Sequence, residues 1–220
     1  MSLVHRQLKQ DASGHGFDHI QRVDDLSIQF ASQLKVHVDL VRLIVLLHDV
    51  DDYKLVGIEH ANEHKNSRAI MKEAGVDLQT QKLVIENIQR LGYSKYLEGI
   101  RPTSLEGKLV SDADMCDAIG AIGILRVYAY GSSKGQPFFL KEAFPKEKMN
   151  ANDYRKTGSD HTINHFFDKL LKLKSLMLTE PGKIEAQKRH QFLVNFLKQF
   201  FMEEKTNAWL VFLDRYLAKL

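Results

Sequence analysis

The amino-acid sequence predicts an all-α protein that forms a single globular domain. Apolar residues recur at helical spacing along most of the chain, whereas no segment alternates apolar and polar residues as a half-buried strand does. No internal repeat is visible. The 220 residues are 44% hydrophobic, which is enough to bury a substantial core.

The first two helices follow from apolar periodicity. In residues 17–34, the apolar side chains that fall near one face are Ile20, Val23, Phe30 and Leu34. Residues 38–50, VDLVRLIVLLHDV, are apolar almost all round, which is typical of a central helix or of a buried strand. Their length and their many leucines favour the helix.

Local start and stop signals predict the helices that follow. Gly75 ends the helical pattern of residues 58–75, and Asp77 is placed to cap the next helix. Thr103 and Glu106 form the capping-box pattern TSLE. This pattern predicts one long helix that continues through KLVSDADMCDAIGAIGILRVYAYG.

The C-terminal part is predicted as a loop followed by three helices. Glycine, serine and proline collect between residues 131 and 160, which predicts a long polar loop. Helical patterns resume at residues 163–177 and 184–204. The second helix starts after TEPG, with Pro181 in its first turn. A last apolar pattern at 208–220 closes the chain.

Composition excludes several classes of protein. The formal net charge is +3 and no block of five lysines or arginines occurs, so a nucleic-acid partner is not expected. The one cysteine, Cys116, cannot form an internal disulfide, which fits a reducing compartment. A buried helix position for it is favoured over a nucleophile. No apolar run reaches the roughly 18 residues of a membrane span, and the first residues lack a signal-like apolar stretch. We therefore expect a cytoplasmic protein.

Polar residues at the end of an apolar run point to chemistry. His48 and Asp49 stand where the apolar residues 43–47 stop. Burying a charged group costs several kcal/mol unless it is paired or metal-bound. A histidine and an aspartate that share a cavity can bind a divalent ion, but two ligands are too few. His19, near the start of an apolar helix, and Asp114, within another, are further candidates.

The aspartates around Asp114 need separate explanations, because aspartate is unfavourable inside a helix. Asp114 and Asp117 are three residues apart and share a face. Asp112 lies about 200° from Asp114 around an ideal helix, so the two are not expected to bind one ion. A capped or salt-bridged polar group is the simpler interpretation of each aspartate taken alone.

Taken together, these residues resemble the HD superfamily of metal-dependent phosphohydrolases. The matching residues are His19, the adjacent pair His48–Asp49, and Asp114. The flanking sequences SGHGFDHIQRV, LLHDVDDYK and DADMCDAIGAIGILRVYAYG are similar to stand-alone bacterial members, and the similarity covers roughly residues 14 to 203. The resemblance implies an all-helical core, at about residues 14–131, in which the four residues bind a divalent ion. Helices at about 160–220 would pack on this core within one domain, residues 1–220.

The resemblance also implies an activity. Members hydrolyse phosphate esters or anhydrides, so we expect a small phosphorylated substrate, with a nucleotide favoured. The leading hypothesis is a (deoxy)nucleoside triphosphate cut to monophosphate and pyrophosphate. The alternatives are a phosphomonoesterase, a phosphodiesterase, and a silent domain that binds a nucleotide for signalling. The expected cofactor is a divalent ion (Mn, Mg, Ni, Co, Fe or Zn), and a homodimer is left open.

Further residues near the pair are candidates for catalysis or binding. Asp52 would orient water or transfer a proton, although capping or bonding the His48 ring is the alternative. Asp52 would lie one turn from His48 if that helix continued so far. Arg22 would hold a phosphate or form a salt bridge. Lys54 is a second phosphate candidate, against a plain surface lysine.

Two other features have structural alternatives. Tyr128 and Tyr130 would line a base or sugar pocket, but a place in the core is favoured. The pattern HANEH at residues 60–64 fits H-x-x-E-H of inverted zinc proteases, with His60 and His64 on one helical face. Because the set of His19, His48, Asp49 and Asp114 explains more residues, a surface helix that carries His60 and His64 is preferred. A supporting role for His60 or Glu63 beside that set is the alternative.

Overall fold

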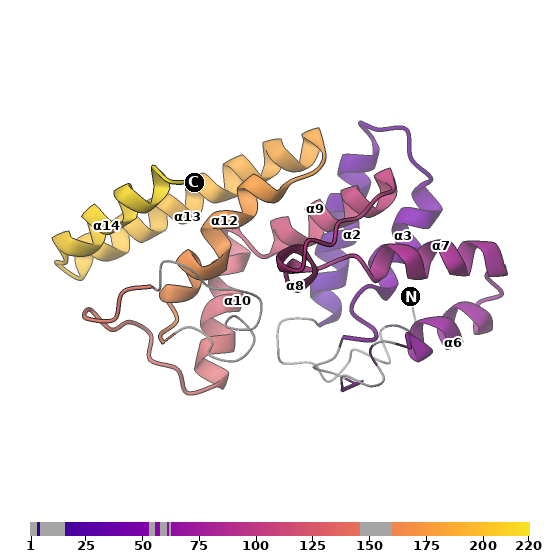
Figure 1. The fold of residues 1–220 in the computed structure, drawn as a ribbon, viewed down its shortest axis with the longest axis horizontal. Coiled ribbons are helices and arrows are strands. Elements are labelled where there is room, and N and C mark those ends of the chain that lie inside the picture. The colour runs from indigo at the N-terminus through magenta and orange to yellow at the C-terminus, as the bar shows by residue number, and fades with distance from the viewer. Residues whose placement is uncertain (1–3, 5–15, 53–55, 58–60, 62, 146–159) are drawn as a thin grey trace. The chain divides into compact units, whose positions relative to one another are not determined.

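The computed structural model describes residue 4 and residues 16–52, 56–57, 61, 63–145 and 160–220 (Figure 1). Every regular element among these residues is helical, so the predicted all-α class is confirmed. The chain divides into two compact units, Met1–Asp114 and Met115–Leu220, and the division falls within one helix. None of the described helices is long and apolar enough to cross a bilayer.

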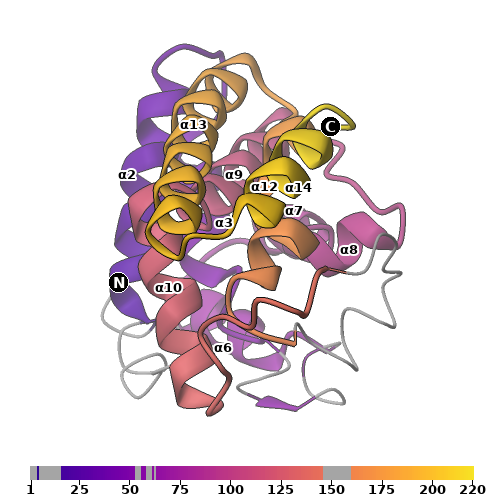
Figure 2. The same ribbon diagram turned by 90° about the vertical axis from the view of Figure 1, so that its left-hand side faces the viewer.

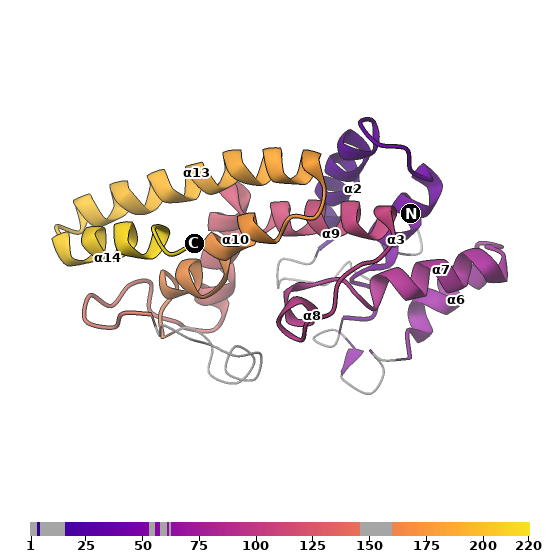
Figure 3. The same ribbon diagram turned by 45° about the horizontal axis from the view of Figure 1, so that its top comes forward.

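Two neighbouring helices form the centre of the first unit. α2 (Phe17–Ala31) packs along α3 (Val38–Leu47), and α3 packs in turn on α7 (Leu78–Ile88) (Figure 1). Because α3 is apolar almost all round, it can contact both neighbours, and its interior side chains are fully buried. The unit also contains α6 (Lys65–Glu73), which packs on α7 (Figure 3), α8 (Tyr93–Leu97) and most of α9 (Leu105–Asp117).

The start and stop signals between α6 and α7 act as predicted. Gly75 adopts a left-handed backbone, with a φ of 71°, directly after α6. The Asp77 carboxylate accepts the Thr80 amide at 3.0 Å and caps α7. Such a cap stabilises the helix, because it satisfies an amide that has no partner within the helix.

The cap predicted for α9 was placed one residue too early. The Ser104 hydroxyl, not Thr103, accepts the Gly107 amide at 3.0 Å in the first turn. Glu106 does not complete a capping box, because its carboxylate accepts the His37 amide at 3.1 Å. A tertiary contact has therefore replaced the local one that the TSLE pattern suggests.

The prediction of one long helix from Leu105 was also wrong. The helix ends at Asp117, and α10 (Gly120–Ser133) begins after a short break. Gly120 has a φ of 77°, and a side chain there would press against Arg189. The Arg189 guanidinium in turn donates to the Cys116 carbonyl at 2.9 Å, beside the bond that this carbonyl accepts from the Ile119 amide at 3.1 Å.

The second unit is built around aromatic side chains. It contains α10, helical turns at 166–176 that include a π-helix (Phe166–Leu170), α13 (Glu180–Glu203) and α14 (Asn207–Leu217). α13 packs on α10 (Figure 2) and on α14 (Figure 3). Trp209 of α14 is fully buried and stacks on Phe144, with 4.4 Å between the ring centroids. Its indole N–H donates a hydrogen bond to the Lys141 carbonyl.

The remaining fold expectations have mixed outcomes. α13 begins as predicted, because Thr179 caps it and Pro181 lies in its first turn. Cys116 is buried, as expected for a core position. Tyr128 and Tyr130 are exposed, so the preferred core interpretation was wrong for both. Packing of the C-terminal helices on a metal-binding core stays a prediction.

His190 provides a test of the second unit by pH. It lies on the buried face of α13, with 6% of its surface exposed. Burial, and to a lesser extent the charge of Lys174, lowers the pKa of His190 to about 4. As the pH falls below about 6.5, His190 becomes protonated in the unfolded chain but stays neutral in the folded one. The unfolding free energy that this histidine contributes above pH 6.5 is therefore lost as the pH falls towards 4.

We therefore expect His190 to remove on the order of 2 kcal/mol of unfolding free energy between pH 7.5 and pH 5. His190→Leu cannot titrate and should lose less stability over this interval, as measured by urea unfolding at both pH values. His37→Gln, at an exposed histidine, is the control. An unchanged pH dependence in His190→Leu would contradict the assignment.

Candidate metal centre

The end of α3 fixes the orientation of His48. The helix stops at Leu47, and the His48 ring nitrogen Nδ1 lies 2.7 Å from the Val45 carbonyl oxygen. A carbonyl only accepts, so Nδ1 is the nitrogen that carries the proton. The other nitrogen, Nε2, is then left with a lone pair when the ring is neutral. This is the arrangement that orients a metal-binding histidine.

His19 brings a second ring to the same point. It lies in the first turns of α2, on the face that packs against α3, and it is fully buried. Its Nε2 atom is 3.4 Å from Nε2 of His48, and the rings meet edge to face. Packing of α2 on α3 therefore holds the two Nε2 atoms close to each other.

Two carboxylates approach these nitrogens. Oδ2 of Asp49 lies 3.5 Å from Nε2 of both His19 and His48. Oδ1 of Asp114, from α9, lies 3.5 Å from His19 and 3.9 Å from His48. The side chain of Asp49 is 12% exposed and that of Asp114 24% exposed, so one edge of the cluster is open to solvent.

The electrostatics of the cluster favour a positive charge at its centre. Burial raises the pKa of Asp114, but the His19 hydrogen bond and the charge on protonated His48 or His19 outweigh it, so the net pKa is lowered. Two carboxylates that are largely buried repel each other. A proton on an imidazole or a metal cation offsets this repulsion.

The donor set fits a divalent metal ion. His19, His48 and Asp49 each offer a ligand atom within 4.8 Å of the others, and Asp114 adds an oxygen near both histidines. Around an ion with bonds of about 2.1 Å, neighbouring ligand atoms are roughly 3.0 to 3.4 Å apart. The observed separations of 3.4 to 3.9 Å are slightly wider than that. Two imidazoles with two carboxylates suit transition metals of borderline softness.

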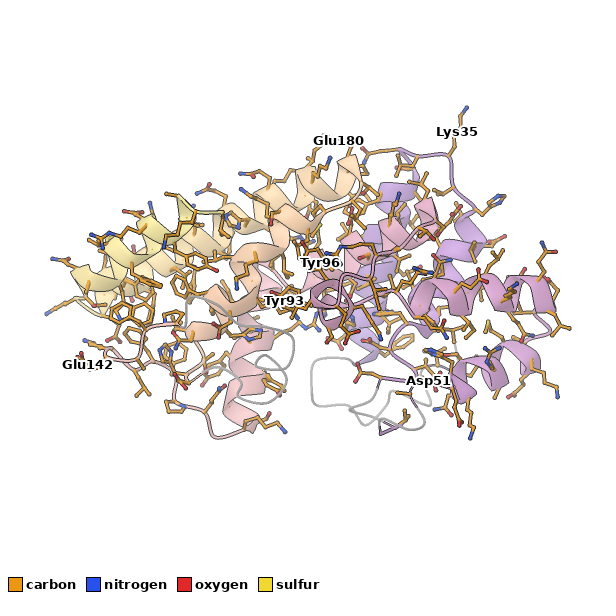
Figure 4. All side chains as sticks on the ribbon, viewed as in Figure 1. Lys35, Asp51, Tyr93, Tyr96, Glu142 and Glu180 are labelled. Carbon is orange, nitrogen blue, oxygen red and sulfur yellow. The ribbon has the colours of Figure 1, made fainter. Side chains whose placement is uncertain are left out.

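Asp51 has a structural role that the sequence did not reveal. Its carboxylate accepts the Asn66 amide at 3.1 Å, the Ser67 amide at 2.9 Å and the Ser67 hydroxyl at 2.5 Å. These amides belong to the first turn of α6, so Asp51 ties the start of α6 to the turn that carries Asp49 (Figure 4). A carboxylate at this position is also stabilised by the positive end of the α6 helix dipole.

The neighbouring candidates have separate positions. Asp52 is half-buried and does not continue α3, since its amide bonds to the Asp49 carbonyl in a tight turn. Arg22 forms an ion pair with Asp18 at 2.9 Å, as one of the two expectations for it allowed. Tyr128, in the second unit, rests its ring edge against Phe138. Lys54 lies outside the described residues. Their functional roles stay predictions.

The other acidic and histidine motifs are now explained or set aside. Asp112 is fully buried, and Asp117 pairs with Arg126 at 2.7 Å, so Asp117 is the salt-bridged aspartate that was anticipated. The zinc-protease pattern at residues 60–64 is not supported. His64 has a left-handed backbone and precedes α6. His60 lies outside the described residues. Glu63 pairs with Lys65.

Comparison with known proteins is consistent with this geometry. Residues 16–119 match the model of the HD domain. The protein YpgQ of Bacillus subtilis is 31% identical over 193 residues, which cover 87% of this chain and 85% of YpgQ. A structure of YpgQ in complex with ADP has a TM-score of 0.66 and 26% identity, and the alignment covers 91% of this chain and 95% of that one.

Two further solved structures are more similar in sequence. An HD-superfamily hydrolase from Bacillus thuringiensis has a TM-score of 0.71 and 34% identity. A protein from Lactobacillus plantarum has a TM-score of 0.77 and the same 34% identity. Each alignment covers 93% of this chain and 94% of the other chain. The similarity therefore extends beyond the matched domain to nearly the whole sequence.

The bonds of Asp51 allow a stability test. Asp51→Ala leaves the half-buried Asn66 amide and the buried Ser67 amide without their acceptor, so we expect a loss of about 2 to 4 kcal/mol in unfolding free energy. Asp77→Ala removes a cap that is exposed to solvent and should cost clearly less. Urea unfolding of both variants measures the difference. Equal losses in the two variants would show that Asp51 is an ordinary exposed cap.

Proposed function

Because the chain belongs to the HD superfamily of hydrolases, we propose that it is a metal-dependent phosphohydrolase whose substrate is a nucleotide. The favoured reaction cuts a (deoxy)nucleoside triphosphate to a monophosphate and pyrophosphate. The observation that carries this proposal is the convergence of four ligand atoms, two of them nitrogens that already approach to 3.4 Å. The proposed metal ligands are His19, His48, Asp49 and Asp114.

The choice of a nucleotide has support from a relative. YpgQ, which is similar to this chain over most of both sequences, has been solved in complex with ADP. ADP carries a base, a sugar and a diphosphate, so it shares its recognition chemistry with a nucleoside triphosphate. An anionic substrate also suits a site that is open on one edge and has Arg22 one turn from His19.

Different residues near the metal centre would have different roles in hydrolysis. A divalent ion, when bound, polarises a phosphoryl oxygen and lowers the pKa of water. His48 is held in the ligand tautomer by the Val45 carbonyl, so the site needs no rearrangement of that ring. Asp52 would accept or donate a proton beside the site. Arg22 would exchange its exposed partner Asp18 for a phosphate oxygen.

The central test combines metal content with product analysis. Wild type is assayed with Mn²⁺, Mg²⁺, Ni²⁺ and Co²⁺ against a panel of nucleotides, with products identified by phosphorus NMR. We expect pyrophosphate with at least one metal. Asp114→Ala should lose the ion and lower turnover more than about 100-fold, since even residues that only support a ligand change metal affinity by 10- to 100-fold.

Asp25→Ala is the control for that experiment, because Asp25 is an exposed carboxylate on α2 outside the cluster. It should keep wild-type metal content and turnover. Wild type that binds a nucleotide by calorimetry, yet releases neither phosphate nor pyrophosphate with any of the four metals, would overturn the proposal. The result would favour a silent nucleotide-binding domain.

A second prediction separates Asp52 from the ligands. Asp52→Asn should keep its metal, because His19, His48, Asp49 and Asp114 are the proposed ligands, but should lower kcat by about 100-fold through loss of proton transfer. Asp49→Asn, three residues earlier, should instead lose the metal. Metal content by mass spectrometry is compared with kcat. Unchanged kcat in metal-loaded Asp52→Asn would return Asp52 to a structural role.

A further inference from the structure

His64 occupies an unusual position at the start of α6. Its backbone has φ 50° and ψ 42°, in the left-handed region that non-glycine residues rarely adopt. Such backbone strain occurs preferentially at functional sites and needs neighbouring structure to maintain it. Here Asp51 supplies that structure, because it holds the amides of Asn66 and Ser67 immediately after His64.

The His64 ring is polar and incompletely satisfied. Its Nδ1 atom is buried and has no hydrogen-bond partner among the described residues. Burial lowers the pKa of His64, the charge of Asp51 raises it, and the charges of Arg68 and Lys95 lower it. One carboxylate and two cations therefore act on the ring. Of these, Asp51 bonds to the first turn of α6 and Arg68 lies on α6 itself. The oxygens of Asp51 already accept three hydrogen bonds from α6.

The two cations near His64 are held weakly. Arg68 lies one turn further along α6, on the side of His64, and its amide bonds to the His64 carbonyl. Within the described part of the chain, Arg68 is exposed and has no ion pair with a carboxylate. Lys95, from α8, has a partly exposed pair with Glu98 at 3.6 Å. Exposed pairs of this kind contribute at most about 1 kcal/mol, so an anionic ligand can replace them.

We propose that His64, Arg68 and Lys95 form an anion subsite that binds the outer phosphates of a polyphosphate substrate. The inference rests on the proposed function, because it places this subsite beside the candidate metal centre. Asp51 joins the two, since two residues of chain, at most about 7 Å, separate it from Asp49. The subsite would confer preference for triphosphates over monophosphates, because only the longer chain of phosphates reaches it.

Direct binding of inorganic tripolyphosphate tests the subsite without requiring turnover. In calorimetry with the metal-loaded protein, Arg68→Ala and His64→Asn should each raise the Kd about tenfold, as expected for a lost charged or polar contact. Asparagine is chosen because it tolerates the left-handed backbone. Lys82→Ala, on α7 with a 78% exposed side chain paired to Glu86, is the matched control and should bind like wild type.

Activity provides a readout that a purely structural role would not move. Arg68→Ala should raise KM for adenosine triphosphate about tenfold, while the Kd for adenosine monophosphate stays within twofold of wild type. A loss of both would indicate general damage to the fold and would overturn the subsite. Wild-type Kd for tripolyphosphate and wild-type KM in both variants would overturn it as well.

The same experiments separate this inference from the proposed function. If wild type hydrolyses no nucleotide but tripolyphosphate binding still weakens in Arg68→Ala, the proposed function fails and the anion subsite stands. If hydrolysis depends on Asp114 while both variants bind and react like wild type, the subsite fails and the proposed function stands.

Discussion

The structure of the first unit depends on keeping two buried imidazole nitrogens 3.4 Å apart, each within 3.9 Å of an oxygen of Asp49 and of Asp114. Such a cluster is unfavourable without a cation, because like charges that are largely buried repel. It persists because the backbone around it is fixed by apolar packing. The side chains of Val41, Ile44 and Val45 are fully buried and fix the position of α3, so the helix places His48 at one point. An apolar run that ends abruptly in charge is the consequence of this constraint.

The turn after α3 gives successive acidic residues different tasks. Asp49 faces the histidines, while Asp51 points to α6 and binds the amides of its first turn. This division follows from the end of the helix, because a tight turn directs neighbouring side chains to different elements. A continuous helix would have placed Asp52 above His48 and left α6 without its cap. The same turn therefore presents ligands and anchors the helix that carries His64.

Local patterns predicted those features of the fold that depend on nearby residues. The period of α2 and α3 and the Asp77 cap required only residues within a turn or two. The break before α10 was missed because the contacts around it are distant in sequence: Arg189 binds the Cys116 carbonyl and lies against Gly120. The bonds of Asp51 were missed for the same reason. In the site, spacing alone left several interpretations of each aspartate open, and only the resemblance grouped Asp114 with His19, which lies 95 residues earlier.

Charge balance explains why weakly held cations near this site matter. A divalent ion would offset the two carboxylates of the cluster, so a triphosphate, with on the order of four negative charges, would still need positive partners. Some arginines of the chain are committed to structure, such as Arg126, which pairs with buried Asp117. Arg22, by contrast, bonds to a carboxylate that is 76% exposed, a contact of less than about 1 kcal/mol. A phosphate can displace such a partner at little cost, whereas displacing Asp117 would leave a buried charge unpaired. The arginines with exposed side chains or partners are therefore the ones available to a substrate.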